Sequence, residues 1–318
     1  MRRTFPSLGF RGWSLVALFV LASSGCAIKQ TTVIQPFAVP APPREATLEE
    51  LIANLNSQAD DVRTLQAKVD LETTTGSVYS GVINEYHDVQ GYILIQKPDL
   101  IRIIGQVPIV GTNIFDMVSD ADEFQLYIPS KAKFIIGKTS LHRDSENKLE
   151  NLRPQHILDA MLVPPISPQD HCYLEEAESE ATKKDEHRYY IVTVLGIEPT
   201  GAVELKRKVW FDRSDLEMAR LQLYESGGRH VEDVQYSDYQ NFGGTRYPTR
   251  LLVKRPVEDY QLAITIANVP TMNQPIDPAK FTLQRPAGVE LVDLDAEPSK
   301  SSVGAAPARQ MGGKPVDQ

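Results

Sequence analysis

The segment that decides the fold reads Gly91-Tyr-Ile-Leu-Ile-Gln-Lys-Pro-Asp-Leu-Ile-Arg-Ile-Ile104. Two runs rich in Ile and Leu, at 91–96 and 100–104, flank Lys97-Pro98-Asp99, and proline beside aspartate is typical of a turn. Isoleucine favours the pleated, half-buried surface of a strand. The segment therefore predicts two neighbouring β-strands joined by a turn.

Further strands are predicted on both sides of this pair. In residues 65–71 every second residue is apolar, so one face of a strand carries Leu65, Ala67, Val69 and Leu71. Short apolar runs separated by turn residues predict the other strands, at 114–118, 124–128, 133–136, 189–195, 203–211, 220–224, 230–236, 249–254 and 261–267. The chain is thus predicted to be mostly β.

Two helices are expected among these strands. Thr47 and Glu50 have the spacing of a capping box, and the residues that follow share one apolar face, namely Leu48, Leu51, Ile52 and Leu55. Polar residues predict an end to this helix near 56–61. Pro154 opens the second helix, since proline is tolerated at a first helical position, and its apolar face holds Ile157, Leu158, Met161 and Leu162.

The pattern as a whole indicates an α+β protein, mostly β, with a single curved antiparallel sheet and helices on one face. No repeat of fixed period is visible in the sequence, which argues against a propeller or a solenoid.

The first residues have the layout of a secretory signal. Residues 1–25 combine three arginines with a short apolar stretch and the small residues Ser23-Ser24-Gly25. The apolar stretch is too short for the roughly 20 residues of a membrane-spanning helix. Cys26 follows directly, as in the bacterial lipobox, although Ser23 stands where lipoboxes usually carry Leu. We predict that Cys26 is diacylated, because two acyl chains give stable anchoring; the alternative is an ordinary secreted protein.

Composition divides the rest of the chain. Prolines predict an extended tether over 26–46, the predicted helices and strands fill a domain over 47–294, and a segment nearly without large apolar residues predicts a disordered tail over 295–318.

Charge and cysteine content exclude several classes of function. The chain has 33 Lys and Arg against 42 Asp and Glu, a net charge of −9, and residues 1–25 contain three arginines and no acid, so the remainder carries −12. Such a chain is not expected to bind nucleic acid, which requires clustered cations. Cys172 is the only cysteine after Cys26, so a disulfide within the chain is not expected if Cys26 is lipidated.

Motifs for catalysis are absent, and we predict no enzymatic activity, no metal and no cofactor. Asp170-His171-Cys172 looks like a nucleophile set, but neighbouring residues of a strand point to opposite faces. Acidic runs such as Glu175-Glu176 are interpreted as a solvated loop. A periplasmic enzyme that uses scattered residues is the least favoured class.

One segment stands out as a candidate site. Val107, Pro108, Ile109, Val110 and Gly111 combine apolar side chains with Pro and Gly, which mark a loop. Apolar residues on an exposed loop are unfavourable in water unless they meet a membrane or an acyl chain. The alternative is a turn that is buried in the core.

Several of these features together resemble the LolA/LolB superfamily of lipoprotein carriers, and LolB-like outer-membrane lipoproteins in particular. The similar pieces are the Cys26 region, the first helix leading into residues 62–68, the 91–102 pair and Ile276-Asp-Pro-Ala-Lys-Phe-Thr-Leu283, which resembles the closing strand of the family. The resemblance implies an incomplete antiparallel barrel, with helices as a lid on its concave face, around an apolar cavity for acyl chains.

The resemblance also implies roles for residues. Pro108 to Gly111 match the protruding loop of LolB, with Ile109 at the apolar tip and Val110 as an extra residue. Side chains that would line the cavity, or simply form the core, are Ile93, Ile95, Ile101, Ile103, Phe115, Met117, Ile157 and Met161. Ala27 and Ile28, which include no Asp after the cysteine, favour sorting to the outer membrane.

The leading hypothesis is therefore a monomeric outer-membrane lipoprotein that faces the periplasm and binds the acyl chains of a lipoprotein or lipid. Its partners would be membrane lipid, through Cys26, and that cargo. The competing hypothesis is a non-enzymatic scaffold for envelope assembly that binds a protein partner.

Overall fold

A computed structural model describes residues 42–75, 84–139, 154–178, 187–197 and 201–296 of the chain. Cys26, most of the predicted tether and residues 297–318 of the predicted tail lie outside the described residues. Among the described residues, no helix is both long and apolar enough to cross a membrane.

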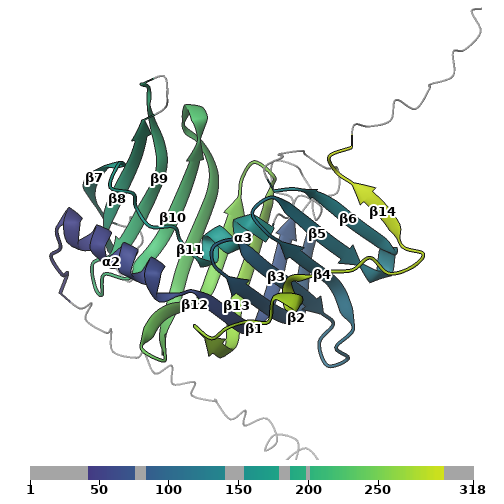
Figure 1. Cartoon of the computed structure of the whole chain (residues 1–318). Coiled ribbons are helices and arrows are strands. Elements are labelled where there is room, and N and C mark those ends of the chain that lie inside the picture. The colour runs from purple at the N-terminus through teal and green to yellow at the C-terminus, as the bar shows by residue number, and fades with distance from the viewer. Residues whose placement is uncertain (1–41, 76–83, 140–153, 179–186, 198–200, 297–318) are drawn as a thin grey trace, which may run out of the picture. The chain divides into compact units, whose positions relative to one another are not determined.

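The described residues form fourteen strands and two α-helices (Figure 1). The helices are α2 (Leu48–Asp61) and α3 (Pro154–Met161). The strands are β1 (Thr64–Thr75), β2 (Asn84–Gln96), β3 (Leu100–Gln106), β4 (Asn113–Ser119), β5 (Glu123–Ile128), β6 (Lys133–Lys138), β7 (His171–Glu178), β8 (Arg188–Ile197), β9 (Val203–Asp212), β10 (Met218–Glu225), β11 (Arg229–Phe242), β12 (Thr245–Arg255), β13 (Tyr260–Met272) and β14 (Glu290–Asp293). Three short 3₁₀ turns are η1 (Pro129–Lys131), η3 (Ser226–Gly228) and η4 (Pro278–Phe281).

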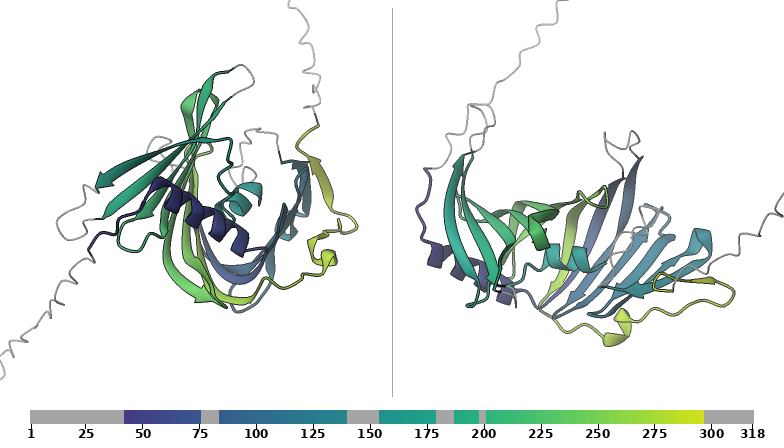
Figure 2. Two further views of the ribbon diagram at one scale, coloured as in Figure 1. Left: turned by 60° about the vertical axis from the view of Figure 1, so that its left-hand side comes forward. Right: turned by 90° about the horizontal axis from the view of Figure 1, so that it is seen from above.

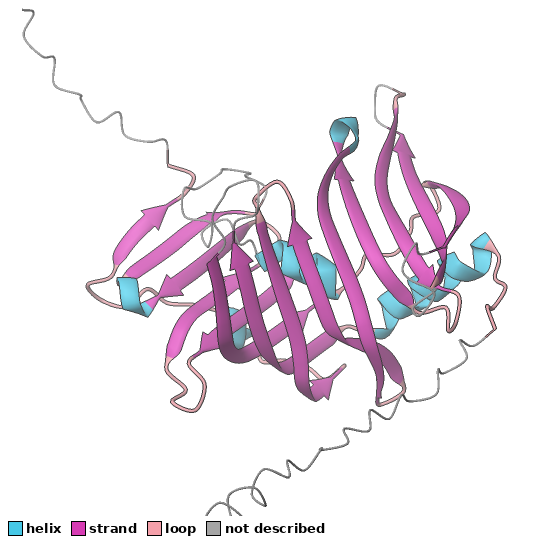
Figure 3. Cartoon of the chain, turned by 180° about the vertical axis from the view of Figure 1, so that it is seen from behind, coloured by secondary structure: helices cyan, strands magenta, loops and turns pink. Residues whose placement is uncertain are grey.

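All fourteen strands belong to one sheet, which Figure 3 shows from behind. The strand order is β14-β6-β5-β4-β3-β2-β1-β13-β12-β11-β10-β9-β8-β7. Neighbours are antiparallel except β14, which pairs in parallel with β6. The early strand β1 lies between β2 and the late strand β13, so it joins the two halves of the chain. The end strands β7 and β14 do not pair with each other, and the sheet is curved but not closed. The predicted fold class is confirmed.

One face of the sheet is apolar because the side-chain period of a strand matches the sequence pattern. A row of buried side chains crosses six neighbouring strands at paired positions, and it consists of Ile135, Leu126, Met117, Ile103, Ile93 and Ala67. This is the concave face of the sheet, and both helices pack on it (Figure 2).

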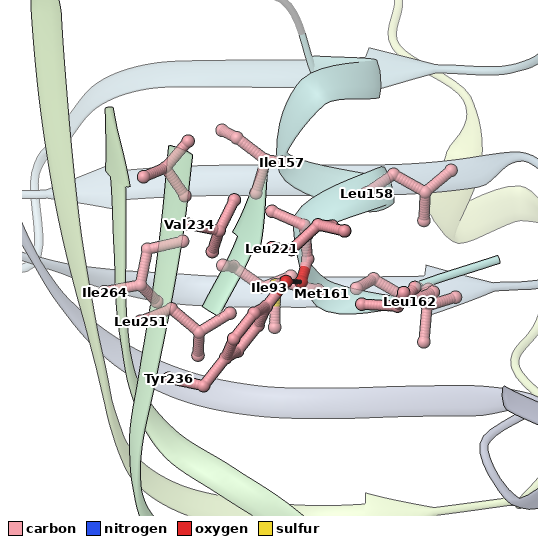
Figure 4. Packing of buried hydrophobic residues seen from close by; sticks show 14 of the residues in the cluster. Ile93, Ile157, Leu158, Met161, Leu162, Leu221, Val234, Tyr236, Leu251 and Ile264 are labelled. Atoms are coloured by element: carbon pink, nitrogen blue, oxygen red, sulfur yellow. Dashed lines mark hydrogen bonds between the residues drawn. The ribbon is translucent and has the colours of Figure 1, made fainter. Parts of the chain in front are cut away.

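Helix α3 lies within the curve of the sheet and buries Ile157, Leu158 and Met161 there (Figure 4). Two tyrosine hydroxyls from the sheet hold its last turn. Tyr236 donates to the carbonyl of Ala160 at 2.8 Å, and Tyr247 donates to the carbonyl of Met161 at 2.7 Å. These carbonyls would otherwise lack partners at a helix C-terminus.

Helix α2 begins as predicted, with both hydrogen bonds of the capping box between Thr47 and Glu50. It ends within the predicted range, and its asparagines bond to other parts of the fold. The side chain of Asn56 donates to the carbonyl of Ile166 and accepts from its amide, at 3.2 and 2.7 Å. The helix therefore continues to Asp61 and is tied to the segment that follows α3.

The closing strand expected at 276–283 is not a strand, because Pro278 opens the 3₁₀ turn η4 there and its side chain leaves no backbone N–H for a ladder.

Two strands also differ from the sequence prediction. Glu175 and Glu176 are solvated, but they lie in the end strand β7 and not in a loop. Acidic side chains on an end strand hinder pairing with other chains. Strand β14 was not predicted because its few residues gain their partners only from β6, far away in the sequence.

Candidate functional site

The candidate loop connects β3 to β4 and is held in shape by its own backbone. The amide of Val107 donates to the carbonyl of Thr112, and the amide of Gly111 donates to the carbonyl of Val107, both at 2.9 Å. Pro108 and Gly111 fit this tight closure, since Gly111 has φ of 71°.

The apolar side chains of this loop point into solvent. Ile109 is 105% exposed, Val110 is 73% exposed and Val107 is 40% exposed. The interpretation of residues 107–111 as a buried turn is therefore wrong, and both Ile109 and Val110 are free to meet another surface. That this surface is a membrane stays a prediction.

The tip of the loop also carries backbone strain. Ile109 has φ of 69°, in the left-handed region, where a β-branched side chain is a rare outlier. Such outliers cost about 1–3 kcal/mol and gather at functional sites. A large apolar residue that is fully exposed and also strained does not stabilise the fold, and this points to a role outside it.

The predicted lining residues come together in one cluster beneath α3. Seven of them are buried, namely Ile93, Ile95, Ile101, Ile103, Met117, Ile157 and Met161, while Phe115 is half-buried at the edge of the cluster. Ile157 and Met161 belong to the helix, and the others belong to strands β2 to β4. Figure 4 shows Ile93 with these two helix residues. In this conformation α3 fills the concave face.

A small cavity remains where α2, α3 and strands β10 to β12 meet. Its volume is about 40 Å³, and its lining includes Leu55, Met161, Leu162, Tyr236 and Tyr247. This space suits a few water molecules at most. A cavity of this size does not hold an acyl chain.

A group of buried charges lies at the same face. Arg255 donates to Glu232 at 3.0 Å and to both oxygens of Glu258 at 2.6 and 3.2 Å. Glu232 is 0% exposed, and burial raises its pKa to about 7. Burial also raises the pKa of Asp159, which is on α3 and accepts a hydrogen bond from Gln155. Two carboxyl groups with raised pKa values therefore lie in this part of the interior.

Sequence reasoning missed these charges and the two tyrosines that hold α3. A signal was present, because the strand alternation of residues 230–236 places Glu232 on the same face as Val234 and Tyr236. A charged residue on an otherwise apolar face indicates a buried, paired group.

The Asp170-His171-Cys172 set does not form a nucleophile site. Lys206 bonds Asp170 at 2.7 Å, His171 is exposed, and burial raises the pKa of the Cys172 thiol. A nucleophilic cysteine needs a lowered pKa. In the part of the chain that the structure describes, no group of three or more His, Cys, Asp or Glu could hold a metal ion.

No protein-family model matches the sequence, and no curated protein matches it either. Three solved structures are similar over 73% of this chain. One is a LolA superfamily protein from Nitrosomonas europaea, 15% identical, matched over 97% of its length with a TM-score of 0.44. Another is a DUF1329 family protein from Desulfovibrio piger, 14% identical, matched over 94% with a TM-score of 0.47.

The third is a domain from Vibrio parahaemolyticus described as a putative outer membrane lipoprotein-sorting protein domain, 9% identical, matched over 94% with a TM-score of 0.41. The likeness concerns the fold, and function depends on the side chains of each chain. The chain is similar in fold to these three structures, one of which is a LolA superfamily protein.

Proposed function

We propose that this protein is a lipid-handling lipoprotein of the outer membrane, anchored through Cys26 and facing the periplasm. Its 107–111 loop contacts the bilayer, and its concave face receives the acyl chains of a lipoprotein or lipid when α3 moves away. It acts without a cofactor and makes or breaks no bonds.

The observation that carries this proposal is the exposure and backbone conformation of Ile109. A fully exposed β-branched residue in a left-handed conformation is unfavourable in water, and Val110 beside it is exposed as well. Burial in hydrocarbon would gain about 1.5–3 kcal/mol for each such side chain. The loop is therefore suited to insert shallowly into a membrane.

The concave face supports the second half of the proposal. It is lined by buried aliphatic side chains on β1 to β6, and α3 covers it as a short helix of eight residues. Apolar contacts are non-directional, so hydrocarbon can take the place of the apolar side chains of α3 against the sheet. The polar contacts that would have to break include those of Tyr236 and Tyr247.

Binding to vesicles tests the membrane contact. The chain from residue 26, with Cys26→Ser, would be mixed with phosphatidylcholine vesicles and sedimented. Replacing both Ile109 and Val110 by Glu should abolish binding. The matched control replaces Ile197 and Val203 by Glu, because these side chains are also exposed, at 56% and 62%, in the β8–β9 hairpin. Equal loss in both variants would contradict the proposal.

Binding of a fluorescent fatty acid tests the concave face. Met161→Glu on α3 and Ile103→Glu on β3 would each place a charge in the interior. A variant that still folds should no longer bind the fatty acid but should bind vesicles as the parent protein does. A parent protein that takes up no fatty acid, in solution or from vesicles, would exclude the acyl-binding role.

A scaffold role through the sheet edge is less well supported. The end strand β7 carries Glu175, Glu176 and Glu178, and charged side chains on an edge hinder strand addition by a partner. Capture of a protein partner from envelopes without lipid cargo would nevertheless favour the scaffold.

A further inference from the structure

A second apolar surface lies on the convex face of the sheet, away from the helices. There a groove of about 370 Å³ runs over β1, β2 and β3, with η4 beside it, and its lining includes Gln66, Tyr92, Leu94, Arg102, Ile104 and Lys280. The volume is within the range of sites for small ligands. Tyr92 lies opposite Ile104, and Leu94 lies opposite Arg102, in the pairing of β2 with β3.

The groove continues the apolar surface of the 107–111 loop. Nine large apolar side chains are exposed among the described residues, and four of them lie on β2 or in this loop, namely Tyr92, Val107, Ile109 and Val110. Ile104 precedes Val107 by three residues along the chain, so the groove begins about 10 Å from the base of the loop.

Lys280 lines the groove, and Lys68 lies beside the lining residue Tyr92. The ammonium of Lys280 donates to the side-chain oxygen of Gln66 at 3.3 Å, and no carboxylate of the described residues lies within ion-pair distance of it. Lys68, opposite Tyr92 on β1, likewise has no ion pair within the described ranges.

Arg102 does not add to this free charge. It donates to both oxygens of Asp116, at 2.9 and 2.6 Å, and its remaining nitrogen donates to the carbonyl of Lys280 at 2.8 Å. The arginine thus fixes η4 and its lysine at the rim. Lys280 and Lys68, which form no ion pair with any other described residue, thus stand beside an apolar surface in a chain with a net charge of −9.

We propose that this groove binds an anionic phospholipid of the bilayer that the loop contacts. The phosphate lies between Lys280 and Lys68, and the start of an acyl chain lies along Tyr92 and Ile104. A shallowly inserted segment enters the boundary between headgroups and acyl chains by about 5–10 Å, which brings a groove at this distance to the level of the headgroups. The inference rests on the loop contact proposed above and names the lipid class that this contact prefers.

Tyr92→Trp provides a local reporter for this site. The chain from residue 26 with Cys26→Ser contains one other tryptophan, Trp210 on β9. The same chain without Tyr92→Trp therefore gives the fluorescence of Trp210 by itself, as the reference. Vesicles would contain phosphatidylcholine with 30% phosphatidylglycerol, and either lipid would be brominated to quench nearby fluorescence. Brominated phosphatidylglycerol should quench the introduced tryptophan more strongly than brominated phosphatidylcholine at equal density, and Trp210 should show no difference.

Lys280→Gln and Lys68→Gln should each lower the phosphatidylglycerol-dependent part of vesicle binding about fivefold, the effect of one basic residue near an anionic surface. They should also abolish the difference in quenching. Lys254→Gln on β12 is the matched control, because it removes the same charge from another strand and should change neither measurement.

The outcomes separate the two proposals. If Ile109→Glu with Val110→Glu leaves vesicle binding unchanged, the loop contact itself fails. If the chain binds vesicles but both lipids quench the introduced tryptophan equally, or Lys254→Gln acts like Lys280→Gln, the groove is not a phospholipid site. Displacement of phosphatidylglycerol by glycerol 3-phosphate in solution would show that the groove takes free phosphate, and would equally overturn the assignment to a bilayer lipid.

Discussion

The hydroxyl of Tyr236 on β11 donates a 2.8 Å hydrogen bond to the main-chain carbonyl of Ala160, in the last turn of α3. The bond is buried, and with the equivalent bond from Tyr247 to Met161 it fastens a short helix to the concave face. Both bonds join a side chain of the sheet to the main chain at the end of α3, and if α3 moves away from the concave face, as proposed above, both must break.

We expect Tyr236→Phe and Tyr247→Phe each to lower the free energy of unfolding by about 1 kcal/mol, since a buried carbonyl loses its partner. Each should also speed the uptake of a fluorescent fatty acid, measured by stopped flow. Tyr239→Phe is the control, because the hydroxyl of Tyr239 donates to the carbonyl of Met218 on β10 and not to a carbonyl of α3. Faster uptake in all three variants would show that α3 is not the barrier.

Replacement of Ile109 by Gly separates stability from function. Glycine adopts a φ of 69° without strain, so Ile109→Gly should raise the free energy of unfolding by about 1 kcal/mol in urea titrations. The same change removes the exposed side chain and should weaken vesicle binding by about tenfold or more. Val110→Gly relieves no such strain and should not stabilise the protein. A loss of stability in Ile109→Gly would mean that the side chain serves the fold.

Glu232 predicts an unusual dependence of stability on pH. Its pKa is raised from 4.5 to about 7 in the folded protein, so the folded state holds the proton more tightly than the unfolded state. Stability from this group is complete below the unfolded pKa and is lost as the pH rises through about 7. The free energy of unfolding should therefore increase by about 2 kcal/mol from pH 8 to pH 5.5.

Urea titrations at the two pH values check this, and Glu232→Gln should remove most of the change. Burial raises the pKa of Asp159 in the same direction, so a small increase should remain. The pKa values of Asp170 and Asp212 are lowered, so these groups change the free energy of unfolding only below about pH 4, outside the range from pH 5.5 to pH 8. An unchanged pH dependence in Glu232→Gln would exclude this residue as the cause.

Gly91 and Gly105 lie opposite each other on β2 and β3, and the sheet has no room for a side chain at either place. A Cβ at Gly91 would lie 1.9 Å from the carbonyl oxygen of Ile104, and one at Gly105 would meet the ring of Phe115 at 2.3 Å. Gly91→Ala should cost about 3 kcal/mol or more because backbone must move, and Gly105→Ala should cost less because a ring can turn. Gly111→Ala, with open space but φ of 71°, should cost about 1 kcal/mol in the same thermal or urea measurements.

The type of most elements could be predicted because their signals are local. The alternation in 65–71, the apolar runs of 91–104 and the capping box at Thr47 each act within a few residues. Elements that depend on distant partners could not be predicted. Strand β14 forms only against β6, and acidic β7 forms only against β8, since Glu175 lies opposite Ile191 in that pairing.

The candidate site shows the same division. Pro108 and Gly111 predicted the loop, because proline restricts the backbone locally and glycine frees it. The exposure of Ile109 depends on whether the rest of the fold covers the loop, and the sequence left that open. The groove beside Lys280 joins residues from β1 to β3 with η4, which are separated by up to 214 positions.

By itself, the sequence determined a mostly β chain, two amphipathic helices and an apolar loop between two strands, because period, caps and turn residues are properties of short segments. Only the tertiary structure decided that α3 fills the concave face, that Ile109 faces solvent while Ile103 is buried, and that Glu232 is buried against Arg255. The physical reason is that burial is set by what covers a residue, and here the covering segments come from distant parts of the chain.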